Sequence, residues 1–358
     1  MRSLRLDLGE RSYPIHIGRA LPPGLLTDAL AGRPAVALVD SEVARLQAPA
    51  LARLLGGLPR LIVPSGEASK SLARREALAR ERLALGLGRD GALVAVGGGV
   101  CGDLCGFLAA CYLRGIPFVQ VPTTLLAQAD ASVGGKVAVN LPGAKNSLGA
   151  FHQPVAVLAD LDFLGSLPRR ELSAGLAEIA KIAAVRDRDL LAELERGGVA
   201  LLAADAPALV GILGRACALK AEVVADDERE AGRRAILNFG HTIGHGLEGL
   251  SPRPDLLHGE AVAIGMLAAL RLGAALGLAG RAEEQRLAAL LRAWKLPLRP
   301  PAPVAIDSLL AAMGSDKKRR RGALRFVLLE GWGQPRRDVE LPGPLLAQTL
   351  AAFLADAE

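Results

Sequence analysis

Hydrophobic residues in the first half of the chain occur in short runs, each followed by a longer segment of helical periodicity. The runs are PAVALVD (34–40), RLIVPSG (60–66), GALVAVGGG (91–99) and PFVQVPTT (117–124). Short apolar runs that alternate with helices of roughly ten to fifteen residues are typical of parallel βαβ units. Residues 1–18 alternate polar and apolar positions, as a strand does. We therefore predict an α/β first half, whose last strand lies in AVLADLDFL (156–164).

The pattern changes after residue 167, where helical periodicity takes over. The helical segments are RRELSAGLAEIAKIAAV (169–185), ALVGILGRACALKAEVVADD (208–227), RRAILNFGHTIGHGLEGL (233–250) and HGEAVAIGMLAALRLGAALGLA (258–279). A strand signal returns only in ALRFVLLEG (323–331). We expect two domains, an α/β domain over 1–167 and a mostly helical domain over 168–358.

The composition is that of a soluble globular protein. Hydrophobic residues make up 51% and charged residues 22% of the 358 residues. The formal charge of +6 suits an anionic small substrate, and acidic residues are interleaved with the basic ones, so nucleic acid is not an expected partner. The most apolar long run, residues 261–280, contains Arg271 and follows Glu260, which favours a buried helix over a membrane span.

The beginning of the chain and the cysteines indicate a cytoplasmic protein. Residues 1–18 lack the features of a secretory signal. The four cysteines, Cys101, Cys105, Cys111 and Cys217, lack the CxxC pairs of structural zinc sites. We predict that they are small buried side chains in a reducing compartment, with a redox or metal role as the alternative.

Three of the five histidines fall between residues 238 and 266. His241 and His245 are four residues apart and share a helix face, and His258 follows at the start of another helix. Glu178 could complete a His/His/Glu set, a ligand mixture typical of catalytic zinc sites. The alternatives are structural histidines and, for Glu178 and its neighbour Lys181, a surface salt bridge.

Two segments after predicted strands have features of nucleotide sites. Gly97, Gly99 and Gly102 form G-x-G-x-x-G between a strand and a helix, where a backbone turn can approach a pyrophosphate. PSGEASKS places Glu67 and Lys70 at a helix start after a strand. Tight packing explains the glycines equally well, and an ordinary capped helix explains the second segment.

Two polar segments are candidate anion sites. TTLLAQADASVGGKVAVNLPGAKN (123–146) looks like a Gly-rich loop that carries two lysines, and a solvated loop is the alternative. The basic run GSDKKRRRGALRF (314–326) suits a solvated loop, phosphate binding by Lys317 or Lys318, or nucleic-acid contact, although no aromatic platform accompanies it.

A series of motifs runs in order from about residue 9 to residue 335. The densest are GGGVCGDLCGF (97–107), VPTTLLAQADASVGGKVAVN (121–140), AKNSLGAFHQP (144–154), ELSAGLAEIAK (171–181), LNFGHTIGHGLE (237–248) and HGEAVAIGM (258–266). Together they resemble the 3-dehydroquinate synthase family. The resemblance implies an α/β N-terminal Rossmann-like nucleotide-binding domain and a mostly α-helical C-terminal metal-binding domain, in a homodimer.

The resemblance also implies roles for individual residues. Zinc or cobalt would be bound by Glu178, His241 and His258. NAD would contact Asp40, Ser65, Gly66, Glu67, Lys70, Gly97, Gly98, Gly99, Asp103, Thr123, Thr124, Lys136 and Lys145. The substrate would contact Arg114 of the neighbouring subunit, Asp130, Lys136, Asn146, Lys181, Lys220, Arg234, Asn238, His245, Lys317 and Lys318. Catalytic roles would fall on Lys136, Lys181, Asn238 and His245.

The implied activity is that of a lyase of the shikimate pathway of aromatic amino acid biosynthesis. It converts the sugar phosphate 3-deoxy-D-arabino-heptulosonate 7-phosphate to 3-dehydroquinate and phosphate, and it oxidises and re-reduces the substrate with one NAD. The chain departs from the family pattern at Glu42, Val137, Ala138, Ala144 and Ile182. Alternatives are a related sugar phosphate cyclase, a polyol dehydrogenase that uses NAD and metal, and a non-enzymatic basic binding protein.

Overall fold

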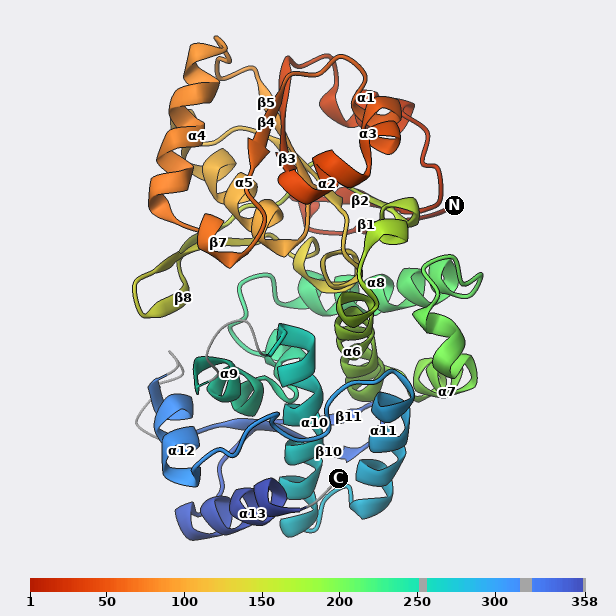
Figure 1. Ribbon diagram of the computed structural model, residues 1–358, viewed down its shortest axis with the longest axis vertical. Coiled ribbons are helices and arrows are strands. Elements are labelled where there is room, and N and C mark those ends of the chain that lie inside the picture. The colour runs from red at the N-terminus through yellow and green to blue at the C-terminus, as the bar shows by residue number, and fades with distance from the viewer. Residues whose placement is uncertain (251–255, 316–323, 357–358) are drawn as a thin grey trace. The chain divides into compact units, whose positions relative to one another are not determined.

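The chain divides into two compact units in a computed structural model that describes residues 1–250, 256–315 and 324–356 (Figure 1). Unit 1 comprises Met1–Pro168 and Ala204–Arg229, and unit 2 comprises Arg169–Ala203 and Glu230–Glu358. Helix α8 (Leu209–Asp226) belongs to unit 1 because it packs on strands β1 and β2. The single boundary expected near residue 167 therefore misses the segment that returns to unit 1.

Unit 1 is built around a seven-stranded sheet in the order β1-β2-β9-β6-β5-β3-β4. The strands are β1 (Arg2–Leu6), β2 (Tyr13–Gly18), β3 (Ala35–Asp40), β4 (Arg60–Val63), β5 (Ala92–Gly97), β6 (Phe118–Pro122) and β9 (Ala156–Asp160). All neighbours pair in parallel except β1 and β2. The parallel α/β prediction is confirmed. The single strand expected at residues 1–18 is instead an antiparallel pair, separated by a turn of 3-10 helix, η1 (Gly9–Arg11).

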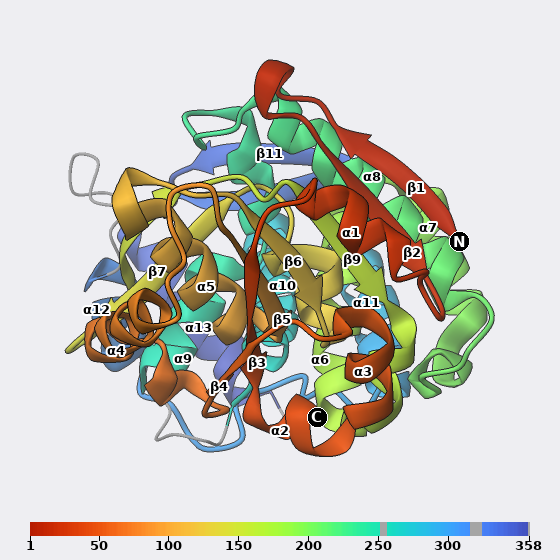
Figure 2. The ribbon, with the colours of Figure 1, turned by 90° about the horizontal axis from the view of Figure 1, so that it is seen from above.

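Helices cover both faces of the parallel strands (Figure 2). They are α1 (Gly24–Leu30), α2 (Ser41–Leu46), α3 (Ala48–Leu55), α4 (Leu72–Ala84) and α5 (Gly99–Cys111). Successive side chains of a strand point to opposite faces, so Ala37 and Val39 join the core under α1 and α3. Val36 and Leu38 join the core under α4 and α5. Coverage on both faces explains why these strands are apolar without alternation.

The glycine-rich segment predicted as a loop contains a β-hairpin. Its strands are β7 (Lys136–Leu141) and β8 (Ala144–Phe151), preceded by a turn of π-helix, η4 (Ala127–Ala131). Gly143 has φ +76° at the turn, and a Cβ on Gly149 would lie 2.2 Å from the carbonyl oxygen of Val137. Glycine is therefore required for pairing here, and it hides the strand signal.

Unit 2 is mostly helical. Its elements are α6 (Arg169–Arg186), α7 (Arg188–Gly197), η6 (Gly198–Leu202), η7 (Arg233–Asn238), α9 (His241–Leu250), α10 (His258–Ala275), α11 (Arg281–Ala293), α12 (Ile306–Ser315), α13 (Gly343–Ala355) and the hairpin β10 (Phe326–Gly331) and β11 (Gln334–Val339). Most residues of α6 and α10 are buried, in agreement with their alanine-rich sequences. Among the described helices, none is long and apolar enough to cross a membrane.

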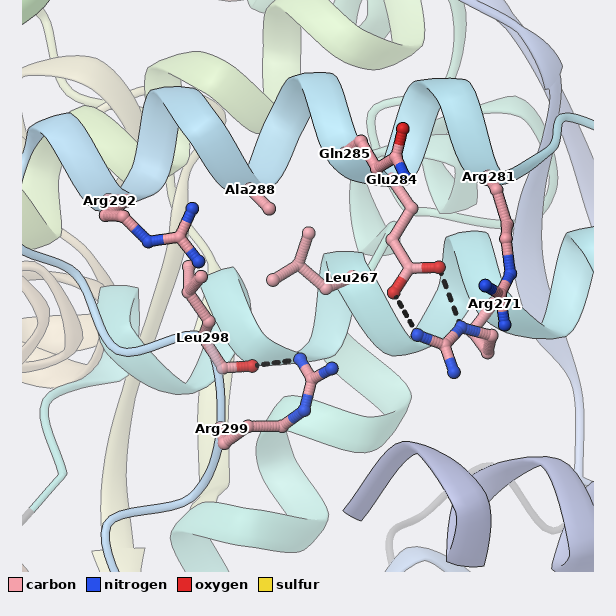
Figure 3. Close-up of a pocket in the computed structure, with 9 residues that line it drawn as sticks. All are labelled: Leu267, Arg271, Arg281, Glu284, Gln285, Ala288, Arg292, Leu298 and Arg299. Atoms are coloured by element: carbon pink, nitrogen blue, oxygen red, sulfur yellow. Dashed lines mark hydrogen bonds and ion pairs between the residues drawn. The ribbon is translucent and has the colours of Figure 1, made fainter. Parts of the chain in front are cut away.

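An arginine network joins α10, α11 and α13 around a cavity of about 130 Å³ (Figure 3). Arg271 donates to both carboxylate oxygens of Glu284, at 2.7 and 2.6 Å, and to Asp356 at 2.8 Å. The guanidinium of Arg299 stacks on Phe353, 4.0 Å from the ring centre. Because these arginines are occupied by carboxylates and an aromatic ring, the network serves helix packing in unit 2.

Candidate active site

Three metal-ligating side chains of unit 2 converge from three helices. Glu178 lies on α6, while His241 and His258 are the first residues of α9 and α10. Glu178 Oε1 lies 3.7 Å from His241 Nε2 and 3.4 Å from His258 Nε2. Metal–ligand bonds of about 2.0–2.1 Å in a tetrahedral site place neighbouring donor atoms roughly 3.3–3.4 Å apart. The spacing therefore fits a single divalent ion.

Glycines bring these helices together. A Cβ on Gly259 would lie 2.0 Å from the carbonyl oxygen of Ala174 on α6, and a Cβ on Gly265 would lie 2.0 Å from that of Gly240. Gly240, with φ +79°, lies directly before α9. Helix α10 thus approaches both α6 and the start of α9 closely, because these positions carry no side chain. Glu178 lies one turn after Ala174 on α6, so this packing brings His258, the residue before Gly259, beside Glu178.

The chemistry of the donor set also fits a metal. Glu178 is fully buried, and a buried carboxylate needs compensating positive charge. Lys181 Nζ contacts Glu178 Oε2 at 2.5 Å and is itself 1% exposed, so the alternative of a surface salt bridge is wrong. With a metal bound, one carboxylate and two neutral imidazoles would form the ligand mixture of catalytic zinc sites, which leave a position for substrate.

His245 and Glu248 lie on the following turns of α9. The ring of His245 is 5.2 Å from that of His241 and 5.9 Å from that of His258, between centroids. His258 Nδ1 lies 3.2 Å from Glu248 Oε2. His245, Glu248 and His258 form a second group whose ligand atoms are close enough to hold a metal. The sequence interpretation missed Glu248, although it lies seven residues after His241 and hence on the same helix face.

The two carboxylates around His258 create a strongly negative environment. Burial alone lowers the pKa of His258, but hydrogen bonds and charge interactions with Glu178 and Glu248 outweigh it and raise the pKa to about 10. The same two carboxylates, 3.4 and 3.2 Å from the ring nitrogens, also favour a bound cation at this site.

Further predicted substrate residues of unit 2 lie on η7, just before α9. Arg234 is 3% exposed, and Asn238 Nδ2 donates to Glu230 Oε1 at 2.7 Å. Glu230 is a second residue that the sequence interpretation missed. Lys317 and Lys318 lie outside the described residues.

The predicted NAD residues of unit 1 gather at the carboxyl ends of four strands. Asp40 ends β3 and caps α2 by accepting from the backbone N–H of Glu42 at 2.9 Å. The hydroxyl of Ser65, which with Gly66 follows β4, donates to the same oxygen at 2.5 Å. Strand β3 lies between β4 and β5, so the chain changes direction across the sheet here. Ligands of open α/β sheets bind at such switch points.

The glycine turn lies next to Asp40. A Cβ on Gly97 would lie 2.5 Å from that of Cys101 and 3.0 Å from that of Asp40, so packing alone requires this glycine. A Cβ on Gly98 would meet Thr124 at 3.1 Å, whereas one on Gly99 would meet nothing nearer than 3.4 Å. Thr123 donates its backbone N–H to Gly97 at 3.0 Å. The G-x-G-x-x-G turn is tightly packed and also opens helix α5. Tight packing and nucleotide contact, the two interpretations of this motif, are therefore compatible.

Lys70 is the centre of a polar network that joins several predicted residues. Its side chain is 6% exposed, and its ammonium group contacts the carboxylate of Asp103 and lies 2.5 Å from Asn146 Oδ1. Burial raises the pKa of Asp103, and Lys70 opposes that shift. Glu67 accepts from Asn140 Nδ2 at 2.6 Å. Asn140, which the sequence interpretation missed, also donates its backbone N–H to the carbonyl oxygen of Lys70 at 2.8 Å and so links the hairpin to this network.

Asp130 and Lys220 form a second polar pair in unit 1. Lys220 Nζ on α8 lies 2.8 Å from Asp130 Oδ1 and also contacts the carbonyl oxygen of Asp130. Lys220 is 4% exposed, and Asp130 lies in the π-helical turn η4. Single π-helical turns often occur at functional sites. Lys136 and Lys145 are exposed on the hairpin β7–β8.

Arg114 lies at an exposed turn, η3 (Tyr112–Arg114), with an unusual backbone. Leu113 and Arg114 have φ angles of +49° and +75°, a region that non-glycine residues seldom adopt. Such strain is concentrated at functional sites.

All four cysteines are free. The expected burial is confirmed for Cys101, Cys105 and Cys217, whereas Cys111 is exposed.

Known proteins resemble this chain over nearly its whole length. Family models described as 3-dehydroquinate synthase N-terminal and C-terminal match residues 60–174 and 175–319. The 3-dehydroquinate synthase of Methylococcus capsulatus is 47% identical over 357 residues, 99% of each chain. That of Acidithiobacillus ferrooxidans is 46% identical over 361 residues, again 99% of each chain.

Solved structures of sugar cyclases have the same fold. A 2-epi-5-epi-valiolone synthase from Streptomyces hygroscopicus, with NAD+ and Zn2+ bound, has a TM-score of 0.88 and 31% identity over 97% of this chain and 98% of its own. A 2-deoxy-scyllo-inosose synthase complexed with carbaglucose-6-phosphate, NAD+ and Co2+ has a TM-score of 0.86 and 26% identity over 98% and 99%. The expected fold is thereby confirmed. The chain belongs to the 3-dehydroquinate synthase family.

Proposed function

We propose that this chain converts 3-deoxy-D-arabino-heptulosonate 7-phosphate to 3-dehydroquinate and inorganic phosphate, with catalytic NAD and a divalent metal. Relatives named for this activity match 99% of the chain at 46–47% identity. The observation that carries the proposal is the buried convergence of Glu178, His241 and His258, with a spacing suited to one metal ion. The metal is zinc or cobalt, as in the structural neighbours.

The chemistry divides between the two units. When bound, NAD+ accepts and returns a hydride, and the metal acts as a Lewis acid on a substrate oxygen. Nucleotide binding belongs to unit 1, supported by Asp40 and the Gly97 turn at the switch point of the sheet. Metal binding belongs to unit 2. The proposal thus keeps a nucleotide-binding first domain and a metal-binding second domain, as the sequence predicts, but places α8 in unit 1.

The cations of the chain suit a substrate that carries a phosphate and a carboxylate. Guanidinium and ammonium groups bind such oxyanions by charge-assisted hydrogen bonds. The proposed substrate contacts are Arg114, Asp130, Lys136, Asn146, Lys181, Lys220, Arg234, Asn238, His245, Lys317 and Lys318. His245, one turn beyond a metal ligand, would donate a hydrogen bond to the phosphate and assist proton transfer as phosphate leaves.

The proposal includes a cytoplasmic homodimer. The four free cysteines fit a reducing compartment. The strained and exposed Arg114 fits a residue that serves the site of a neighbouring subunit.

The test follows phosphate and NADH together after the heptulosonate phosphate, NAD+ and zinc are added. We expect phosphate release with no lasting NADH, because the hydride returns within each turnover. A chelator should abolish turnover, and added zinc or cobalt should restore it. Stoichiometric accumulation of NADH would refute the cyclase and favour a dehydrogenase. Failure to release phosphate from this substrate, with release from another sugar phosphate, would indicate a related cyclase.

A further inference from the structure

His258 has a carboxylate at each nitrogen of its ring. Nε2 lies 3.4 Å from Glu178 Oε1, and Nδ1 lies 3.2 Å from Glu248 Oε2. The side chain of Glu248 is 10% exposed, so its carboxylate is largely removed from water. An imidazole that offers Nε2 to a metal carries its proton on Nδ1, and that N–H needs an acceptor.

We propose that Glu248 is a positioning residue of the metal centre. Its carboxylate accepts the Nδ1–H of His258, which fixes the tautomer, holds the ring plane toward the ion and makes Nε2 a stronger donor. The inference rests on the proposed function, because it takes Glu178, His241 and His258 as the metal ligands.

The packing of α9 on α10 sets this contact. Helix α9 contributes the ligand His241 at its first residue and Glu248 two turns later on the same face. A Cβ on Gly244 would lie 3.0 Å from the carbonyl oxygen of Ala261, so the two helices are closely apposed between these turns. The same interface therefore positions a metal ligand and the residue that orients another ligand.

An alternative is that Glu248 is itself a ligand, in the group with His245 and His258. The burial of the two groups favours the arrangement in which Glu178, His241 and His258 bind the metal and Glu248 orients His258. Glu178 is fully buried and His241 is 7% exposed, whereas His245 is half-buried and the side chain of Glu248 keeps 10% of its surface exposed. A bound cation compensates a fully buried carboxylate more than a partly hydrated one, so Glu178 gains more from the ion.

The experiment measures metal affinity in the full-length protein without substrate. Zn2+ affinity is determined by competition with a chromophoric chelator, and the visible spectrum of the Co2+ form reports coordination geometry. The variants are Glu248→Ala and the isosteric Glu248→Gln. The matched control is Glu284→Gln, because Glu284 is also 10% exposed and also paired with a basic side chain, that of Arg271 (Figure 3).

We expect Glu248→Ala to bind Zn2+ about 10–100-fold more weakly, at unchanged stoichiometry and with an altered Co2+ spectrum. Glu248→Gln should fall between Glu248→Ala and the parent, because its amide oxygen still accepts the Nδ1–H but carries no charge. The control should keep the parent affinity and spectrum. If Glu248→Ala does not fold, as judged by circular dichroism, the smaller reduction in zinc affinity expected for Glu248→Gln, measured against the control, decides.

Unchanged affinity in both Glu248 variants would overturn the inference. So would a metal-free Glu248→Ala protein alongside a Glu178→Gln protein that binds zinc like the parent, since Glu248 would then be a ligand. Metal affinity is read without turnover. A parent that binds zinc tightly but releases no phosphate would therefore refute the proposed activity and leave the role of Glu248 standing.

Discussion

The three clustered histidines differ in their surroundings although they occur in one short stretch of sequence. His241 and His258 have Nε2 atoms 3.7 and 3.4 Å from the buried Glu178, whereas the ring of His245 is one turn further along α9. Spacing in the sequence cannot distinguish these roles, because two histidines four residues apart share a helix face and either could meet a ligand from another helix. The buried carboxylate from another helix makes the distinction.

Removal of each histidine should therefore have a different effect. His241→Ala and His258→Ala should lose bound zinc as well as activity, because each removes a proposed ligand. His245→Ala should retain zinc and turn over about 10²–10⁴-fold more slowly, the usual loss for an acid–base group. Metal analysis of the purified proteins beside a turnover assay checks this. A metal-free His245→Ala protein with a zinc-loaded His241→Ala protein would reverse the assignment.

The largely buried pair of Lys70 and Asp103, whose side chains are 6% and 17% exposed, should make stability depend on pH in a defined direction. Burial raises the pKa of Asp103 in the folded state, and Lys70 opposes the rise. In Lys70→Met the pKa rises further. The folded state then holds a proton that the unfolded chain releases, so the free energy of unfolding falls as pH increases above the ordinary carboxyl pKa.

We expect Lys70→Met to lose no more than about 3 kcal/mol at neutral pH, the lower end of the range for a buried pair, because the carboxylate left without its partner is still 17% exposed. The loss should be smaller near the ordinary carboxyl pKa, where the buried group is protonated. Urea unfolding at the two pH values measures the difference. The control is Lys295→Met, since Lys295 is exposed. An equal loss at both pH values would show that Asp103 does not titrate as described.

At the scale of elements, apolar periodicity predicts most of the helices and buried strands, and glycine obscures the strand signal of one hairpin. The buried strands β3, β5 and β6 and the helices α6 and α10 coincide with the predicted segments. The hairpin β7–β8 has the sequence pattern of a loop because Gly143 and Gly149 serve its turn and its pairing. The return of α8 to unit 1 could not be predicted either, since periodicity gives a helix but not the sheet on which it packs.

The crossing of α6 and α10 gives a prediction for an element rather than for a ligand. In Gly259→Ala the new Cβ would lie 2.0 Å from the carbonyl oxygen of Ala174, so the two helices must move apart. We expect a loss of about 1–3 kcal/mol of stability from overpacking. Zinc affinity should fall as well, because His258 moves with the helix. Chemical unfolding with chelator and a zinc competition assay measure the two effects.

The control for this prediction lies on the neighbouring helix. A Cβ on Gly249 of α9 would meet no heavy atom within 4 Å. Gly249→Ala should therefore keep its zinc affinity and gain up to about 1 kcal/mol, because alanine is the better helix residue. If Gly259→Ala behaved like Gly249→Ala, close packing would not be what positions His258.

At the scale of the whole molecule, motif order identified the family and the fold, whereas residue roles depend on contacts between distant segments. Glu230, Asn140 and Glu248 were missed because each acts on another polar side chain, and no local pattern marks such a residue. Arg114 is the opposite case. The family resemblance implies a role in a neighbouring subunit, and the structure adds an exposed turn with two consecutive non-glycine residues of positive φ.

Mixed dimers test the role of Arg114 across subunits. Arg114→Ala and Lys136→Ala should each be inactive alone. If Arg114 serves the partner's site, a dimer with one subunit of each kind has one site with both lesions and one with neither. Random reassociation makes about half of the dimers mixed, so an equal mixture should recover about a quarter of the parent activity. Turnover of reassociated dimers, with mixing verified by two affinity tags, measures the recovery. If Arg114 served its own subunit, every site in a mixed dimer would carry one lesion and no activity would return.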